Sequence, residues 1–306
     1  MNKKFVIYTN GYNDNIGGIV VLHQLCDLLN KRGEQAYIWN RYRPLFNFKQ
    51  PLRSLYLFFK YYKKMMKHGY NMNPRLKTPL ATKADLEDAI VIYPEIVEGN
   101  PLQGKNVVRW LLHKPGFNSS GKIDFGKNDL FFYYLKAYDD SRFNKFPDNY
   151  LHIENIRRDT YTQTNFAERK GSCYIVRKAK NPQFIHDLSD SIQIDGLSHQ
   201  EMAEVFNKVK YCIAYDPYTM FSVYAVMCGC ISIIVPESGV TKEQWQPSEE
   251  DRYGLAYGFD DVEYALATKE KLLYRLEQKE IESNILVDEF VSKCKNYFDA
   301  KNEKNH

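Results

Sequence analysis

A strand, a glycine-bearing loop, a helix and a second strand follow one another at the start of the sequence. Residues 3–10 (KKFVIYTN) are predicted to form a short buried strand, and residues 10–18 (NGYNDNIGG) a polar loop. Residues 19–31 are predicted to form a helix, because Ile19, Leu22, Cys26 and Leu29 fall on one face. Gly33 then ends the helix, and residues 35–39 (QAYIW) begin another strand. Such a unit is right-handed and belongs to a parallel sheet covered on both faces.

The second half of the sequence repeats this alternation of strands and helices. Strands are predicted in SCYIVRKAKN (172–181), SIQIDGLS (191–198), YCIAYD (211–216) and CISIIVPE (230–237). Helices are predicted in NPQFIHDL (181–188), in residues 198–209 with Ser198 and Glu201 as a capping box, in residues 219–229, and from residue 260 almost to the end.

Two sets of alternating strands and helices predict an α/β protein with two Rossmann-like domains facing across a cleft. The predicted N-terminal domain covers residues 1–165 and contains a basic, aromatic insertion at about 41–77. The predicted C-terminal domain covers residues 166–306 and includes the C-terminal helices. Ligands of open α/β sheets bind outside the carboxyl ends of the strands, so the cleft is the predicted site.

The basic insertion is the most asymmetric feature of the charge distribution. The stretch from Gln35 to Ala84 contains eleven Lys and Arg but no Asp or Glu, whereas the whole chain carries a net charge of only +4. A helix over about 52–67 would carry an apolar face and adjacent lysines, namely Leu55, Phe58, Phe59, Tyr62 and Met66 beside Lys60, Lys63, Lys64 and Lys67. Basic amphipathic helices of this kind lie on anionic membranes.

Two alternatives remain for this insertion. It could be a helix that packs on the core and keeps a solvated basic face. Its interleaved aromatic and basic residues could also stack on single-stranded nucleic acid. No nucleic-acid-binding motif surrounds it, so no nucleic-acid partner is predicted.

The sequence predicts a cytoplasmic protein, with peripheral attachment to the inner face of the cell membrane as an option. It lacks a run of about 18 apolar residues, and the apolar run near its start is too short for a signal peptide. The six cysteines lack metal-ligand spacing and are predicted to be reduced, buried thiols. No metal or cofactor is predicted, and the adjacent Asp139 and Asp140 are the alternative metal ligands.

The segment 215–229 predicts an anion site where a strand leads into a helix. Asp216 ends the strand, and Thr219 can cap the helix or donate its hydroxyl to a phosphate oxygen. Arg177, Lys178 and Lys180 follow another strand of the same half and could complete a diphosphate site. The alternative is an ordinary helix cap with unrelated surface cations.

From about residue 172 to 245 the sequence resembles the C-terminal, donor-binding half of GT-B glycosyltransferases. Their pattern has an acidic residue, a loop, a helix with Glu-Ala-Met-Ala-x-Gly and an apolar strand. Here the helix contains Tyr224-Ala225-Val226-Met227-Cys228-Gly229, and Asp216 precedes Tyr224 by eight residues, the spacing of the two acids in retaining families. The loop through Gly17 and Gly18 matches the glycine-rich loop of the acceptor half. The length and the string NPLQGKNVVRWLLHKPG (100–116) resemble bacterial polysaccharide glycosyltransferases.

This resemblance implies a metal-independent enzyme that takes a nucleotide-sugar donor and a saccharide or lipid-linked acceptor. Tyr224 replaces the Glu that holds the nucleotide ribose in the family, and a phenol cannot accept two hydrogen bonds as a carboxylate does. Glu237 is the predicted substitute for that contact. The predicted donor-side residues are Arg177, Lys178, Lys180, Tyr218, Thr219, Met220, Phe221, Tyr224 and Glu237, with Asp216 beside the donor sugar.

Three residues at predicted strand ends are candidates for a base on the acceptor side, which an inverting reaction requires. They are Asp14, Glu95 and His113. Glu95 is preferred because it directly follows an apolar strand and a proline, although backbone N–H groups could equally hold such a loop residue. Retention and inversion both remain open. The alternative functions are a nucleotide-sugar epimerase and a non-catalytic module that binds nucleotide-sugars or glycans.

Overall fold

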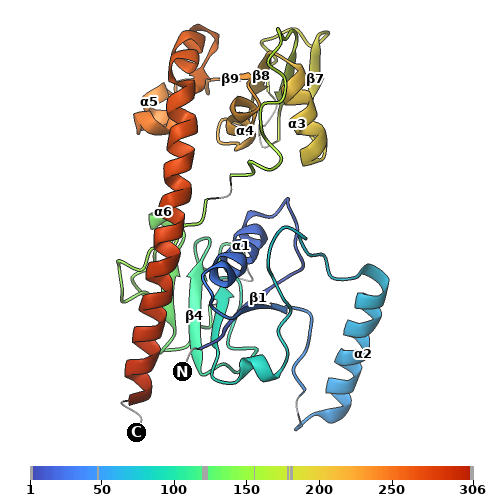
Figure 1. The fold of residues 1–306 in the computed structure, drawn as a ribbon, viewed down its shortest axis with the longest axis vertical. Helices are drawn as coiled ribbons and strands as arrows, with labels where there is room; N and C mark the ends of the chain where they lie inside the picture. Colours follow the sequence, from blue (N-terminus) through green and yellow to red (C-terminus); the bar gives the residue numbers. More distant parts are fainter. Residues whose placement is uncertain are drawn as a thin grey trace. The chain divides into compact units, whose positions relative to one another are not determined.

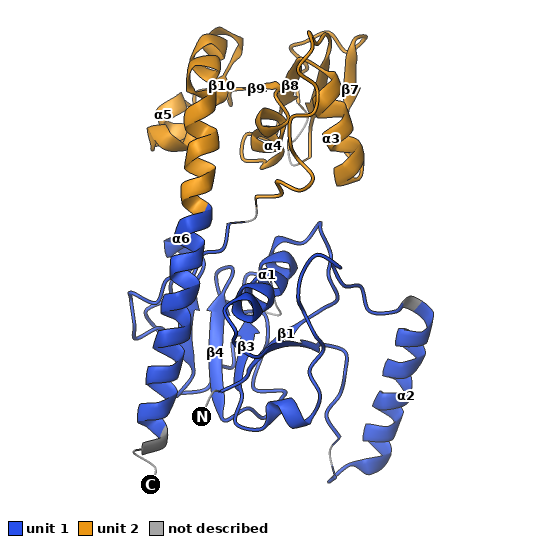
Figure 2. Cartoon of the chain, viewed as in Figure 1, with its two compact units in different colours: residues 1–155, 280–306 blue, residues 156–279 orange. Residues whose placement is uncertain are grey.

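The computed structural model (Figure 1) describes residues 3–46, 48–118, 123–154, 156–177, 179 and 182–303. The chain divides into two compact units, which Figure 2 colours separately. Unit 1 contains residues 1–155 and 280–306, and unit 2 contains residues 156–279. Each unit has a five-stranded parallel sheet with helices, which confirms the predicted α/β class with two Rossmann-like halves.

The sheet of unit 1 has the strand order β2-β1-β3-β4-β5, with all neighbours parallel. Its strands are β1 (Phe5–Thr9), β2 (Ala36–Asn40), β3 (Ile90–Pro94), β4 (Asn106–Leu111) and β5 (Leu130–Tyr133). Nearly every strand residue is buried, as expected for a sheet covered on both faces. Helix α1 (Gly17–Lys31) packs on β1 and β2 and buries the apolar face predicted for it.

The sheet of unit 2 has the order β10-β9-β8-β6-β7 and is again parallel. Its strands are β6 (Ser172–Ile175), β7 (Ser191–Gln193), β8 (Tyr211–Ala214), β9 (Ile231–Ile234) and β10 (Leu255–Tyr257). Its helices are α3 (His199–Lys208), α4 (Phe221–Met227) and α5 (Lys242–Trp245). Helix α3 has the predicted capping box, in which Ser198 and Glu201 each bond the other's backbone N–H.

Short 3-10 turns complete the secondary structure at Ala84–Leu86, Lys136–Tyr138, Glu249–Asp251 and Phe259–Asp261. The helix predicted over residues 181–188 is wrong, because residues 182–188 have no regular structure. The N–H of Ile185 bonds the Tyr215 hydroxyl at 2.9 Å, so it is not donated to a helical carbonyl. All six cysteines are buried free thiols.

Helix α6 (Val262–Glu303) begins in unit 2 and ends in unit 1. The sequence pattern alone placed residues 166–306 in one domain, whereas residues 280–303 belong to unit 1. The reason is an apolar stripe on the last part of α6 that is buried in the unit 1 core, formed by Val287, Phe290, Cys294 and Phe298. The Phe290 ring centroid lies 6.1 Å from that of Phe5 and 4.7 Å from that of Phe132.

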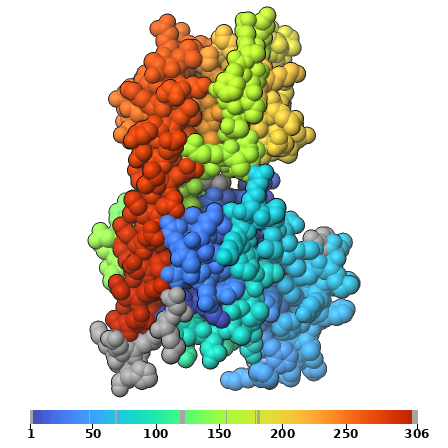
Figure 3. Space-filling model, viewed as in Figure 1, coloured from blue at the N-terminus to red at the C-terminus, as the bar shows by residue number. Residues whose placement is uncertain are grey.

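Helix α2 (Pro51–His68) lies at the periphery of unit 1 (Figure 1) and at the surface of the space-filling view (Figure 3). Most of its described side chains are exposed. Within the part of the chain that the structure describes, no helix is long and apolar enough to cross a membrane.

The packing of α6 on unit 1 predicts a specific loss of stability. Phe290→Ala should lower the free energy of unfolding of unit 1 by about 3–5 kcal/mol, because it empties a fully buried ring site. Hydrogen exchange of the β1 and β4 amides, followed in urea, separates unit 1 from unit 2. Ile285→Ala, at a half-exposed position of the same helix, should change the value by less than about 0.5 kcal/mol. Equal losses in both variants would contradict the packing.

Candidate functional site

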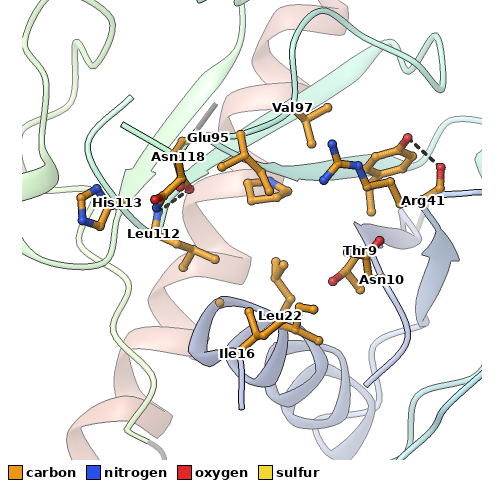
Figure 4. A pocket seen from close by; sticks show the side chains of 15 residues that line it. Thr9, Asn10, Ile16, Leu22, Arg41, Glu95, Val97, Leu112, His113 and Asn118 are labelled. Atoms are coloured by element: carbon orange, nitrogen blue, oxygen red, sulfur yellow. Dashed lines mark hydrogen bonds between the residues drawn. The ribbon is translucent and has the colours of Figure 1, made fainter. Parts of the chain in front are cut away.

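Unit 1 contains a cavity of about 440 Å³ at the carboxyl edge of its sheet (Figure 4). Its wall is formed by the residues that end β1 and β3, the start of α1, and the segment that follows β4. Parallel strands bring these segments together because their carboxyl ends meet at one edge of the sheet. The lining is mainly apolar, and it also includes the polar side chains of Thr9, Asn10, Arg41, Glu95 and His113.

Glu95 is the residue that immediately follows β3, and its side chain lines this cavity. It is only 7% exposed, and its Oε2 accepts the N–H of Leu112 at 3.0 Å. Burial raises the pKa of the Glu95 carboxyl to about 7, and the backbone N–H groups of Leu112 and His113 offset this effect only in part. Glu95 is therefore the carboxyl in this cavity that can both hold and accept a proton near neutral pH.

His113 also lines the cavity, but two aromatic rings hold its ring in place. Its centroid lies 4.3 Å from that of Phe117 and 4.7 Å from that of Tyr138, in stacked orientations. Its buried Nδ1 has no hydrogen-bond partner among the described residues. Figure 4 shows His113 and Arg41 at opposite ends of the group of lining side chains.

The structure separates Asp14 from the two glycines predicted in the same loop, because Gly17 and Gly18 are the first two residues of α1. Asp14 is exposed and does not line the cavity, whereas Gly18 does. A Cβ at Gly18 would reach only Leu112 Cδ1, at 3.6 Å, and a Cβ at Gly17 would meet nothing within 4 Å. Folding therefore does not require glycine at either position. Gly18 lies in the first turn of α1, and its lack of a side chain leaves space in the cavity at this point of the wall.

Unit 2 contains its own cavity of about 990 Å³ at the carboxyl ends of β8 and β9. It is lined by residues 215–218 after β8, residues 235–238 after β9, and part of the segment after β6. Asp216 is 5% exposed, and its Oδ1 accepts the N–H of Tyr218 at 3.4 Å. Asp216, Tyr218 and Glu237, all predicted as donor-side residues, line this one cavity.

Arg177 lies beside the start of α4. Its guanidinium carbon is 5.0 Å from the centroid of the Phe221 ring, the first residue of that helix. Asp195 fixes the turn after β6, because its carboxylate accepts the N–H of Val176 at 2.9 Å and that of Arg177 at 2.7 Å. Lys178 and Lys180 lie outside the described residues.

The start of α4 differs in part from its predicted role as an anion site. The Thr219 hydroxyl accepts the N–H of Phe221 at 3.4 Å, so it acts as a local cap. The Phe221 side chain is buried in the unit 2 core, while Met220 is partly exposed. The helix spans only seven residues, which limits the positive field at its start.

Tyr224, predicted among the donor-side residues, has its side chain in the hydrophobic core of unit 2. Tyr224 is 5% exposed, and its ring stacks on Tyr161 with centroids 4.2 Å apart and planes 7° apart. It lines neither of the two cavities described above. A family motif gives the position of a residue along a helix. It does not show which face of that helix packs against the rest of the unit.

Asp139 and Asp140, the alternative metal ligands, are engaged with protein groups. Asp139 pairs with Lys136 at 2.8 Å, and Asp140 pairs with Arg142 at 2.6 Å. Across the described ranges, no group of three or more His, Cys, Asp or Glu side chains is arranged to hold a metal ion.

The sequence analysis missed an aromatic cluster at the unit 2 cavity. The Tyr215 hydroxyl bonds His186 Nδ1 at 2.8 Å, and His186 Nε2 bonds the Ser191 hydroxyl at 3.1 Å. Burial lowers the pKa of His186. These contacts hold the irregular segment 182–188 against the cavity. Tyr215 and His186 are 29 residues apart in the sequence, so no local pattern could have revealed their contact.

Comparison with known proteins gives little further information. No protein-family model matches the sequence, and no curated protein sequence matches it. Among solved structures, a sucrose-phosphate synthase from Thermosynechococcus elongatus aligns over 99% of this chain and 100% of its own. The TM-score is 0.36 and the sequence identity 9%, values too low to carry a functional argument.

The buried state of Glu95 predicts a pH-dependent stability. Because its pKa is about 7 in the folded chain and about 4.5 unfolded, the folded state binds the proton more tightly. The contribution of Glu95 to stability therefore does not change with pH below about pH 4.5. It decreases as the pH rises from about 4.5 to about 7 and is constant at higher pH. Glu95→Gln should raise the free energy of unfolding at pH 8 by up to about 3 kcal/mol and change it little at pH 4.

Chemical denaturation at several pH values measures this difference, and carbon NMR of the Glu side chains should show one carboxyl that titrates near pH 7. Glu87→Gln, at an exposed position of unit 1 outside the cavity, is the control for loss of a carboxylate elsewhere in the unit. A Glu95 carboxyl that titrates near 4.5 would contradict the assignment.

Proposed function

We propose that this chain is a glycosyltransferase that moves a sugar from a nucleotide-sugar donor to a saccharide or lipid-linked acceptor in the synthesis of a bacterial surface polysaccharide, such as a capsule or lipopolysaccharide. The observation that carries the proposal is Glu95, a nearly buried carboxyl with a pKa of about 7 that lines a cavity at the carboxyl edge of a parallel sheet. A carboxylate with this pKa suits a general base that works near neutral pH.

In this proposal the acceptor occupies the unit 1 cavity, and Glu95 accepts the proton of its hydroxyl. The hydroxyl oxygen forms a bond to the anomeric carbon of the donor sugar as the bond from that carbon to the diphosphate oxygen breaks. The nucleoside diphosphate leaves with the electron pair of that bond. A base on the acceptor side belongs to a direct displacement, so we propose that the reaction inverts the anomeric centre.

The donor is assigned to the unit 2 cavity. Arg177 is fixed beside the start of α4, where a guanidinium can form charge-assisted bonds with a diphosphate. Such cationic stabilisation of a leaving group is the role that we assign to it in place of a metal ion. Asp216, Tyr218 and Glu237 line this cavity, whose lining does not include Arg177, and Asp216 is assigned to the donor sugar.

A non-catalytic module that binds nucleotide-sugars is the second candidate. The observation in its favour is Tyr224, which replaces the Glu of the family pattern and whose ring is stacked on Tyr161 in the core of unit 2. Release of nucleoside diphosphate from a nucleotide-sugar distinguishes the two candidates, because a binding module does not cleave its ligand.

Replacing the proposed base should abolish most of the transfer. Glu95→Gln preserves the shape of the side chain but removes the carboxylate, so transfer should fall at least about a hundredfold. The measurement is nucleoside diphosphate release from a panel of nucleotide-sugars with bacterial lipid and glycan extracts as acceptors. The kcat/KM of the unmodified enzyme should rise with pH through an apparent pKa near 7.

Asp14→Asn is the matched control, since Asp14 is exposed and outside the cavity. It should leave transfer within about twofold. A large loss in Asp14→Asn, together with near-normal transfer in Glu95→Gln, would move the base to the loop before α1.

Removing the guanidinium of Arg177 should weaken nucleotide binding. Arg177→Ala is expected to cost about 1.5–3 kcal/mol in the binding of UDP, GDP or TDP, as measured by titration calorimetry. Lys170→Ala is a control in the same unit, because this exposed cation precedes β6 and lies at the opposite edge of the sheet. Equal affinities in the two variants would show that the diphosphate binds elsewhere.

A further inference from the structure

Helix α2 has two apolar stripes, and only one of them packs on the protein. The inner stripe has the spacing i, i+4, i+7, i+11 and consists of Ser54, Phe58, Tyr61 and Met65, which are buried or half-buried. Met65 Sδ accepts a bond from Asn40 at the end of β2, and the Phe58 ring lies 6.4 Å from that of Phe46. This stripe attaches α2 to the rest of unit 1.

The outer stripe has the spacing i, i+3, i+7, i+10, i+14 and lies about 100° around the helix from the inner one. Its members are Leu52, Leu55, Phe59, Tyr62 and Met66. Their exposed fractions run from 58% at Leu55 to 87% at Met66. Five large apolar side chains on one exposed stripe mark an interaction surface and are not the scattered apolar residues of an ordinary surface.

The third face of α2 is cationic. It carries Arg53, Lys60, Lys63, Lys64 and Lys67, which follow the outer stripe around the helix. No Asp or Glu occurs in the sequence between Gln35 and Ala84 to neutralise them locally. A surface that pairs an apolar stripe with a row of cations is complementary to an anionic lipid bilayer, because each part meets its counterpart at the headgroup boundary.

We infer that α2 is an interfacial helix that docks unit 1 on an anionic lipid bilayer. The outer stripe enters the boundary between headgroups and acyl chains, and the row of cations lies among the headgroups. The inner stripe stays on the protein. The helix lies in the plane of the membrane surface, and Phe58 belongs to the inner stripe and does not enter the lipid.

The C-terminal end of α2 is connected to the cavity that contains Glu95. Gly69 ends the helix, and the Tyr70 hydroxyl then donates to the carbonyl of Asn10 at 3.1 Å. The N–H of Tyr12 donates to the carbonyl of Asn71 at 2.8 Å. Asn10 lines the cavity, so docking through α2 brings the cavity wall to the membrane. This consequence rests on the proposed function: the acceptor reached from the bilayer is lipid-linked.

The first experiment measures binding of the full chain to vesicles without donor or acceptor. The chain should co-sediment with vesicles of phosphatidylcholine and phosphatidylglycerol and bind pure phosphatidylcholine at least about tenfold more weakly. Raising the salt from 50 to 500 mM should lower the partition coefficient at least about tenfold. Changing Lys60, Lys63, Lys64 and Lys67 together to Gln should have a similar effect.

The second experiment reports which side chains enter the lipid. The three native tryptophans, Trp39, Trp110 and Trp245, are all buried, so a new tryptophan on the surface gives the main response to lipid. The emission of Phe59→Trp should shift to the blue with anionic vesicles and be quenched by brominated lipid. Phe166→Trp, at an 81% exposed position of unit 2, is the matched control and should not respond.

Three results would overturn the inference. The first is binding that is equal on neutral and anionic vesicles and insensitive to salt. The second is a Phe59→Trp spectrum that lipid does not change. The third is a dimer that does not bind vesicles and that dissociates in the triple variant Leu52→Ser, Phe59→Ser, Met66→Ser. The last result would mean that a second copy of the chain covers the stripe. Vesicle binding without any cleavage of nucleotide-sugars would support docking and overturn only the proposed function.

If both proposals hold, the triple variant should lose transfer to an acceptor embedded in vesicles. Its hydrolysis of the nucleotide-sugar without acceptor should stay within about twofold of the unmodified enzyme. Loss of both activities would instead show that the outer stripe supports the fold of unit 1.

Discussion

Parallel pairing of β1, β3 and β4 is the constraint on which the candidate site depends. Because these strands point the same way, their carboxyl ends and the segments that follow them meet at one edge of the sheet. Residues from three distant parts of the sequence thus line one cavity. The strands that end at this edge are buried in the core, so the residues of the cavity wall are held by packed strands. The same arrangement recurs in unit 2, where β8 and β9 carry Asp216 and Glu237 to one cavity.

Within this frame, the position of Glu95 costs stability. A carboxyl in a mainly apolar cavity loses hydration, and the backbone N–H groups beside it, including that of Leu112 at 3.0 Å, return only part of it. A glutamine could accept the same N–H of Leu112 without a charge, so it would suit this place better above pH 7. Groups held in an unfavourable charge state occur where a protein moves protons. The structural cost of Glu95 is therefore itself an argument for a chemical role.

Much of the fold could be predicted from the sequence because it depends on local periodicity. Continuous apolar runs such as FVIYT and IVIYP are typical of strands buried on both faces, and the Ser198 capping box marks the start of a helix. The place of Glu95 directly after a buried strand could be predicted for the same reason, because it is a local feature, while its role stays a prediction. The C-terminal part of α6 could not be placed, because an amphipathic pattern does not say which core receives it.

The differences between the sequence-based expectations and the structure have one physical origin. Tyr224 stands at the position of the Glu in the family pattern, but its ring stacks on Tyr161, 63 positions earlier in the chain. The Tyr215–His186 pair likewise joins residues that no local pattern relates. The apolar face predicted for α2 included Phe58 together with residues of the outer stripe. A wide apolar face in the sequence does not show which part of it packs on the protein. Each difference concerns a choice made by tertiary packing.

The two stripes of α2 also explain why this helix can be ordered while most of its surface is exposed. An isolated helix of 18 residues is marginal in water, so α2 needs a tertiary contact, which the inner stripe supplies through Met65 and Phe58. The outer stripe adds nothing to that contact and leaves large apolar side chains in water. Polar residues at these positions would allow unit 1 to fold equally well. Their apolar character is therefore explained by what the helix meets outside the chain.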